Sequence, residues 1–258
     1  MTLNLNVQER HSSSPFDSQS DDAANEYTLV FLYYDNPQML RAQLRCWSSY
    51  KKAFKRTPTI VLVDDGSPQT RAHEIVAQVG CGIPIKVFRI HEDIRWNFAG
   101  ARNLGCMNAN GWIYSSDIDT ILTRDDARLL FEADALESDS FYMPVRVWLP
   151  NLNVGRPGFV NLLFHKSKFL EIGGYDEDYS GHYGREEIDF FERLKKRARC
   201  LSRQDIRIRV MPPFLIDDAC TKDVSRDPIR NREIYRIKSD AGFPFPIDPI
   251  RFSWERVL

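Results

Sequence analysis

The sequence lacks the features of membrane-spanning, disulfide-rich and polyanion-binding proteins. No apolar run in its 258 residues approaches the roughly 20 residues needed to cross a bilayer, and the N-terminus has no signal-peptide pattern. The five cysteines are widely spaced without a C-x-x-C pair, which argues against a disulfide framework or a zinc knuckle. The formal net charge of −1 argues against a polyanion-binding protein. We therefore expect a cytoplasmic protein with no nucleic-acid partner.

The composition that is present suits an ordinary globular domain. Hydrophobic residues make up 43% of the chain and charged residues 28%, enough to bury a sizeable core. Residues 1–26 are polar and aperiodic, and we expect them to form a flexible leader. With no internal repeat or linker, residues 27–225 are predicted to form a single domain. Residues 226–258 are predicted to form a helix and a proline-rich tail that packs on this domain or on a partner subunit, through which an oligomer can form.

Apolar runs alternate with helical patterns in the first half of the chain. Three near-continuous runs predict strands buried on both faces: 27–33, 59–63 and 85–90. Helices are predicted from Pro37 and over about 70–79. A third is expected to follow a loop at 97–103 and to end at Gly111. This alternation favours an α/β fold with a mostly parallel central sheet flanked by helices, in which ligands bind beyond the carboxyl ends of the strands.

Two acidic clusters follow predicted strands. Asp64 and Asp65 close the second strand, and Asp117 and Asp119 close a short strand after the third helix. Aspartates are poor strand formers, so a strand that ends on a pair of them often ends at a site. Along an extended chain Asp117 and Asp119 point to the same side, and carboxylate oxygens suit Mg²⁺ or Mn²⁺. The alternative is a solvated turn, because Asp-x-Asp is frequent by chance.

The second half of the chain is less regular. Strands are predicted at 141–148 and 159–164, and Pro144 indicates an edge position or a bulge. A short helix is predicted from Lys166. From Arg193 to Arg209 the chain has eight basic residues and one acidic residue. This stretch is either a solvated helix face and edge strand, or a docking patch for an anionic acceptor or a membrane surface.

A helix is predicted to begin near Glu186. Its first turn contains Glu186, Glu187 and Asp189, and acids at that end of a helix interact favourably with its dipole. Capping alone is therefore one interpretation of these acids. The predicted apolar face consists of Ile188, Phe191, Leu194 and Ala198.

Five motifs occur in an order that resembles a known family. They are Val63-Asp-Asp-Gly-Ser67, Gly100-Ala-Arg-Asn-Leu-Gly105, Asp117-Ile-Asp119, Gly173-Gly-Tyr-Asp-Glu177 and Gly184-Arg-Glu-Glu-Ile-Asp-Phe190. Over about residues 27–220 the chain resembles a GT-A glycosyltransferase of the inverting family 2 type. Its last motif is similar to the acidic motif of β-1,4-galactosyltransferases and chondroitin polymerase. The resemblance implies a Rossmann-like GT-A fold.

Three departures from the family pattern stand near the end of the resemblance. Arg185 replaces the second glycine, and Glu187 stands where the family usually has aspartate. No histidine follows His182, although many relatives use a later histidine as a metal ligand. The resemblance leaves Asp217 or Asp218 as candidates for that ligand.

The resemblance implies a donor site built from both acidic clusters. Asp64 or Asp65 would accept a hydrogen bond from the uracil edge of a nucleotide-sugar. Arg102, placed in the loop before the third helix, would lie by the nucleotide and its phosphates. Asp117 would contact the ribose or the metal. Asp119 would hold the divalent cation, Mn²⁺ or Mg²⁺, that bridges the diphosphate.

The resemblance also implies a general base on the helix that begins near Glu186. Glu187 would remove the proton from the acceptor hydroxyl, and like-charge repulsion from Glu186 and Asp189 could raise its pKa toward neutrality. Glu186 could instead bind an acceptor hydroxyl. Trp96, Trp148 and Tyr183 are either core residues or faces on which sugar rings stack.

The resulting hypothesis is a metal-dependent glycosyltransferase of the hexosyl- or N-acetylhexosaminyl-transferase type, as in polysaccharide biosynthesis. It would move a sugar from a UDP-sugar to a glycan or lipid-linked acceptor with inversion, and the protein would be cytoplasmic or peripheral to a membrane. A nucleotidyltransferase is disfavoured because Tyr33 to Pro37 contains no glycine-rich phosphate loop. A non-catalytic nucleotide-sugar or glycan-binding protein is the remaining alternative.

Overall fold

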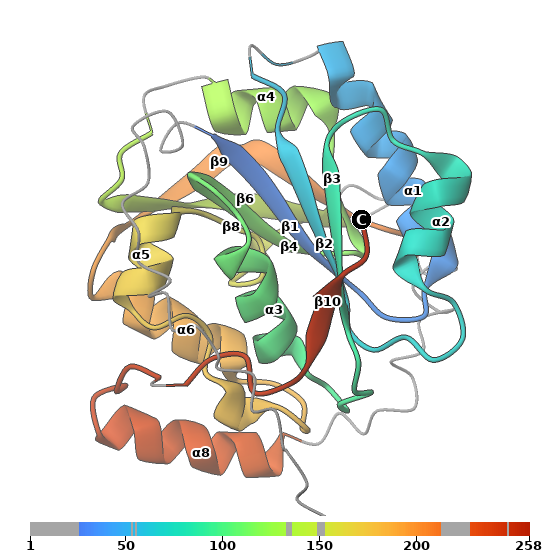
Figure 1. Cartoon of the computed structure of the whole chain (residues 1–258). Helices are drawn as coiled ribbons and strands as arrows, with labels where there is room; N and C mark the ends of the chain where they lie inside the picture. Colours follow the sequence, from blue (N-terminus) through green and yellow to red (C-terminus); the bar gives the residue numbers. More distant parts are fainter. Residues whose placement is uncertain are drawn as a thin grey trace, which may run out of the picture.

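A single mixed sheet forms the centre of the molecule (Figure 1). The computed structural model describes residues 26–258 except 53, 55, 133–135, 149–152, 213–227 and 247. Residues 1–25 of the predicted leader, together with Asp217 and Asp218, therefore lie outside the described residues. Within these residues the strands are β1 (Tyr27–Tyr33), β2 (Thr59–Asp64), β3 (Ile85–Ile90), β4 (Trp112–Asp117), β5 (Thr120–Leu122), β6 (Ser140–Trp148), β7 (Asn153–Pro157), β8 (Leu162–His165), β9 (Arg199–Val210) and β10 (Trp254–Arg256).

Helices cover both faces of this sheet. They are α1 (Pro37–Ser48), α2 (Ala72–Val79), α3 (Phe98–Met107), α4 (Arg124–Glu132), α5 (Lys166–Glu171), α6 (Glu186–Lys195) and α8 (Ile229–Asp240), with 3₁₀ turns η2 (Ser49–Lys52) and η3 (Glu177–Tyr179). The strand order is β10-β3-β2-β1-β4-β8-β6-β9-β5, and β7 pairs with β6. The stretch β3-β2-β1-β4 is parallel, and antiparallel pairs extend it on both sides. The α/β class with a parallel central sheet is therefore confirmed.

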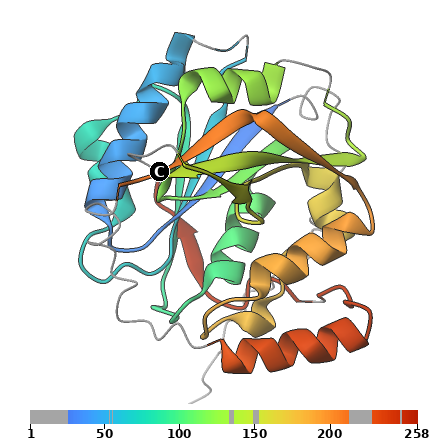
Figure 2. The same cartoon turned by 180° about the vertical axis from the view of Figure 1, so that it is seen from behind.

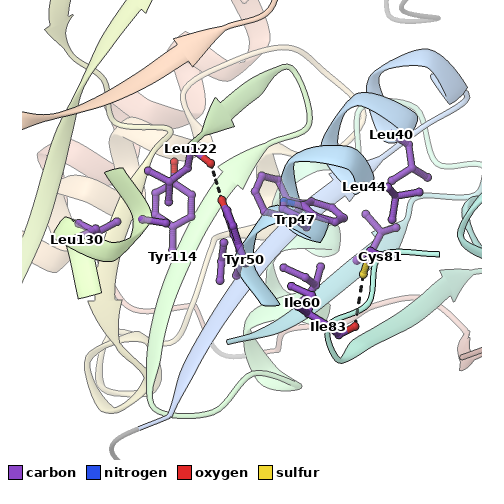
Figure 3. Close-up of a cluster of buried hydrophobic side chains, with 14 of the residues drawn as sticks. Leu40, Leu44, Trp47, Tyr50, Ile60, Cys81, Ile83, Tyr114, Leu122 and Leu130 are labelled. Carbon is purple, nitrogen blue, oxygen red and sulfur yellow. Dashed lines mark hydrogen bonds between the residues drawn. The ribbon is translucent and has the colours of Figure 1, made fainter. Parts of the chain in front are cut away.

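The central strands are buried on both faces because their side chains alternate between two cores. On β1, Leu29 and Phe31 join the core under α1, α2 and α4, whereas Val30 joins the core under α3, α5 and α6. Figure 2 shows the two helix layers from behind. Figure 3 shows the first core, where the Tyr50 hydroxyl donates a 2.5 Å hydrogen bond to the Leu122 carbonyl.

The predicted loop at 97–103 is wrong, because residues 98–107 form α3. The glycines of this helix serve close packing. A Cβ on Gly105 would lie 2.4 Å from Cγ1 of Val30, so only glycine lets the helix approach β1 this closely. The predicted end at Gly111 is also wrong, since the helix ends at Met107 with Asn108 as its C-cap.

Two details of the second half also differ from the prediction. β6 lies between β8 and β9, so the edge position predicted from Pro144 is wrong. The predicted bulge is confirmed, because the register between β6 and β9 shifts directly after Pro144, where the ladder lacks an N–H donor. On α6 the buried face includes Asp189, Phe190 and Arg193, and Ala198 lies beyond the helix end.

The C-terminal segment returns to the body of the molecule after α8, which lies beside η3 and α6 at the outer edge in both views (Figures 1 and 2). β10 pairs antiparallel with β3, and the Val257 N–H donates to the Val87 carbonyl at 2.9 Å. The tail was predicted to pack on its own domain or on a partner subunit, and in the structure it packs on its own domain. No helix among the described residues is long and apolar enough to cross a membrane.

Candidate active site

A cleft of about 770 Å³ opens where β1, β2 and β4 end. Its lining includes most of the predicted site acids, although they come from distant parts of the sequence: Asp65, Asp117, Asp119, Glu186 and Glu187. Parallel strands bring their carboxyl ends to one edge of a sheet, which explains why acids after β2 and β4 meet there. Asp64 and Arg102 do not line the cleft.

Asp64 and Asp65 have different positions after β2. The Asp64 carboxylate is buried and accepts hydrogen bonds from the backbone N–H groups of Ser67 at 2.9 Å and Ala72 at 2.8 Å. It therefore fixes the turn and the start of α2. Asp65 faces the cleft and accepts a 3.0 Å hydrogen bond from Asn97, and burial raises its pKa to about 7. Of the two candidates for the nucleotide base, only Asp65 is accessible to a ligand.

Arg102 is a buried partner of Asp117. Its Nη2 donates to Asp117 Oδ1 and its Nη1 to Ser115 Oγ, both at 2.6 Å. The guanidinium also lies over the Phe98 ring, 4.7 Å from the centroid. Arg102 lies on α3 and its side chain is fully buried, so it holds Asp117 in place from below the cleft. The contact between Arg102 and the donor phosphates, which was predicted for a loop residue, is not supported by this buried position.

Asp119 has an oxygen available for a ligand. Its Oδ1 is buried and has no hydrogen-bond partner among the described residues, an arrangement that costs free energy unless something binds there. Burial, and then the charge of Asp117, raise the pKa of Asp119 to about 6. These two carboxylates fit a divalent cation, although the described residues contain no group of three or more potential protein ligands. Further ligands would have to come from water, a bound anion or the undescribed Asp217 and Asp218.

Glu186 and Glu187 begin α6 and also line the cleft. Trp96 Nε1 donates a 2.9 Å hydrogen bond to Glu186 Oε1, while the buried Oε2 has no partner among the described residues. The pKa of Glu187 is raised well above its usual range by burial, then by the charges of Asp117 and Glu186. The predicted contribution of Asp189 is wrong. That residue lies on the buried face of α6, where it pairs with Arg193 at 2.7 Å.

The entry to α6 has an unusual backbone. Gly184 and Arg185 have φ angles of +88° and +82°, a region that glycine adopts freely and other residues rarely do. The glycine that the family usually has in place of Arg185 therefore has a physical reason. In this chain the Arg185 guanidinium lies over the Tyr235 ring, 5.5 Å from its centroid.

The aromatic candidates divide between the cleft and the surface. Trp96 and Tyr183 line the cleft with ring centroids 4.8 Å apart, so both can meet a ligand. Trp148 is exposed and packs on Gly155, outside the cleft lining. His182 is exposed, and its carbonyl accepts a hydrogen bond from Asn231.

Sequence reasoning missed three polar residues around the cleft. The Asp35 carboxylate lines the cleft and accepts from the backbone N–H groups of residues 69 and 70. Arg146 on β6 lines the cleft beside Asp117, and the buried Asn161 bonds Arg146 from below. The signal for Arg146 was present, because it is the one charged residue in the apolar stretch 141–148. Asn161 stands inside a predicted apolar strand in the same way.

This geometry agrees with a family comparison. The family described as glycosyl transferase family 2 matches residues 34–183, which is more than half of the chain. The match includes Asp65, Asp117 and Asp119 and ends before Glu186 and Glu187. The chain belongs to glycosyl transferase family 2. A comparison with curated protein sequences gave no match.

Solved structures establish the GT-A fold. TarS 1–349 from S. aureus, in complex with UDP-GlcNAc, has a TM-score of 0.59 at 13% identity, covering 86% of this chain and 73% of TarS 1–349. The mannosyltransferase PcManGT from Pyrobaculum calidifontis, in complex with GDP-Man and Mn²⁺, has a TM-score of 0.54 at 15% identity, covering 71% of this chain and 56% of its own. GalNAc-T7 with UDP, GalNAc and Mn²⁺ has a TM-score of 0.55 at 14% identity, covering 72% and 44%. At these identities the similarity concerns the fold, and it confirms the predicted fold class.

Proposed function

We propose that this family 2 member is a metal-dependent glycosyltransferase that moves a sugar from a UDP-sugar to an acceptor hydroxyl with inversion. The observation that carries the proposal is the convergence of Asp65, Asp117, Asp119 and Glu187 on one cleft. TarS 1–349 was solved with UDP-GlcNAc, and PcManGT and GalNAc-T7 were solved with Mn²⁺, which supports a nucleotide-sugar donor and a divalent cation. The acceptor would be a glycan or a lipid-linked sugar.

In this proposal the donor occupies the β-strand side of the cleft. Asp65 accepts a hydrogen bond from the uracil edge, because it faces the cleft whereas the carboxylate of Asp64 is occupied. Asp117 is held by Arg102 and faces the ribose and the cation, and Asp119 offers its unpartnered Oδ1 to the cation. When bound, a divalent cation would stabilise the negative charge that develops on the leaving diphosphate.

The acceptor side of the cleft contains Glu186 and Glu187. Glu187 removes the proton from the acceptor hydroxyl while the hydroxyl oxygen forms a bond to the anomeric carbon and the carbon–phosphate oxygen bond breaks. Its raised pKa suits this role, because a more basic carboxylate accepts a proton more readily. Glu186 is fixed by Trp96 and presents its free Oε2 to an acceptor hydroxyl. The likeness of this helix to the acidic motif of galactosyltransferases remains a prediction.

Nucleotide titration tests the proposal. UDP and GDP should be titrated with and without Mn²⁺ by calorimetry, followed by an assay of transfer and hydrolysis with common UDP-sugars. We expect UDP binding that strengthens with Mn²⁺, and we expect Asp119→Asn to remove this metal dependence. Asp125→Asn, an exposed change on α4, is the control and should retain it.

The outcomes separate the proposal from its alternative. Unchanged metal dependence in Asp119→Asn would exclude this residue as the ligand. Metal-dependent UDP binding without transfer or hydrolysis would favour a non-catalytic nucleotide-sugar-binding protein, a role for which the departures at Arg185 and Glu187 leave room.

A further inference from the structure

Arg146 extends a positive charge over the acid pair at the end of β4. Its Nη2 lies 3.8 Å from Asp117 Oδ2, and 20% of its side chain is exposed to the cleft. Arg102 contacts the other oxygen of the same carboxylate at 2.6 Å with no exposure. Asp117 is thus held between a fixed arginine and a loosely attached one. Only the second of these can reach a ligand in the cleft.

Asn161 fixes the near end of the Arg146 guanidinium. Asn161 Oδ1 accepts a 2.8 Å hydrogen bond from Arg146 Nε. Its Nδ2 donates to Ser116 Oγ at 2.6 Å and to Thr120 Oγ1 at 3.2 Å, on either side of the turn that contains the acid pair. Because Asn161 is fully buried, this anchor is rigid. The Nη groups of Arg146 therefore remain over the acid pair while their contact with Asp117 stays long.

The charges around the cleft require a cation for any anionic ligand. Carboxylates from several segments line it, and a diphosphate brought beside them would be repelled. Two arginines are present among the described lining residues, and Arg146 is the one that contacts the acid pair. A guanidinium matches phosphate oxygens in geometry and charge.

We propose that Arg146 binds the diphosphate of the nucleotide-sugar donor, exchanging its long contact with Asp117 for a phosphate oxygen. This inference rests on the proposed function. The exchange leaves Asp117 paired, because its bond to Arg102 is unaffected. As the bond to the sugar breaks, negative charge grows on the leaving diphosphate, and a fixed guanidinium stabilises that charge.

The test compares a ligand that has phosphates with one that lacks them. Dissociation constants for UDP and uridine should be measured at saturating Mn²⁺ for the wild type and for Arg146→Gln, Arg146→Lys and Arg209→Gln. Arg209 is the matched control, because it is a partly exposed arginine on the neighbouring β9, paired with Asp126 outside the cleft lining. Thermal unfolding checks that each variant is folded.

We expect Arg146→Gln to weaken UDP binding by roughly 10- to 100-fold, the usual effect of losing a hydrogen bond to a charged group, with uridine binding unchanged. Arg146→Lys keeps the charge without the Nε anchor and should lose less. Unchanged UDP binding, an equal loss for uridine, or an equal loss in Arg209→Gln would overturn the inference while leaving the proposed function in place. A wild-type protein that binds no nucleotide would overturn both.

Discussion

Glu187 lies where two neighbouring carboxylates and burial oppose its charge. The raised pKa of Glu187 predicts how the rate of the proposed reaction changes with pH. Transfer should rise as pH rises through the Glu187 pKa, because only the deprotonated carboxylate accepts the proton. A second effect acts in the same direction. As the pH falls, protonation of Asp119, whose pKa is raised to about 6, should weaken metal binding.

The substitution Glu187→Gln separates chemistry from donor binding. We expect transfer to fall by about 10²- to 10⁴-fold, the usual contribution of a general base, while the dissociation constant of UDP changes little. Glu192→Gln on the same helix is the control, since Glu192 is partly exposed and pairs with Lys195. Initial rates and calorimetry provide the two measurements. Transfer that survives in Glu187→Gln would place the base elsewhere.

At the scale of elements, the side chain of Asn103 links two of the sequence motifs. Asn103 on α3 accepts from the Tyr175 N–H at 2.7 Å, and its Nδ2 donates to the Tyr175 carbonyl and to Glu177 Oε1. Arg193 on α6 donates to the carbonyls of Ile172 and Gly174 in the same turn. The turn at Gly173 and Gly174 therefore connects α3, which positions Asp117, to α6, which carries Glu187.

The backbone at the start of α6 gives a prediction about stability. Arg185→Gly and Arg185→Ala both remove the stacking on Tyr235, but only glycine adopts the positive φ without strain. We expect the glycine variant to be more stable than the alanine variant by about 1 kcal/mol. Urea unfolding of the pair measures the difference. Equal stabilities would show that the backbone at this position is not strained.

At the scale of the whole molecule, the C-terminal segment completes the support of the cleft. The Glu177 carboxylate accepts from Asn103 Nδ2 at 2.7 Å and from the backbone N–H groups of Ile250 at 2.6 Å and Arg251 at 3.1 Å. A Cβ on Gly100 would lie 2.5 Å from Phe252, so the tail also packs tightly on α3. The last residues of the chain thus hold the helix that contains Arg102.

This contact predicts a stability effect far from the proposed chemistry. In Glu177→Gln an amide NH₂ would replace one of the two accepting oxygens and would face an N–H donor. We therefore expect a loss of about 1–3 kcal/mol in the free energy of unfolding. Glu255→Gln changes an exposed carboxylate on β10 and should cost little. Denaturant titration compares the two. If both variants unfold alike, Glu177 does not anchor the tail.

Much of the fold follows from the sequence because local patterns determine it. The apolar run of β1 and the Pro37 start of α1 have the predicted positions, since burial on two faces and a proline at N1 leave local traces. The loop predicted at 97–103 was wrong because the close contact of Gly105 with Val30 on β1, which this helix needs, is a tertiary feature with no local signal. Pro144 was compatible with an edge strand or a bulge, and only the pairing of β6 with β8 and β9 decided between them.

The pair Asp117 and Asp119 was visible in the sequence as two acids after a strand, and the α/β class followed from the alternation of strands and helices. The tertiary structure alone decided that Asp65 faces the cleft while Asp64 fixes a turn, and that Arg102 lies beneath Asp117. It also brought Arg146 to the carboxylate of Asp117 and Asn161 to the guanidinium of Arg146. A sequence pattern records which side chains a strand carries. Which of them share one cleft depends on how distant strands pair, and no local signal encodes that.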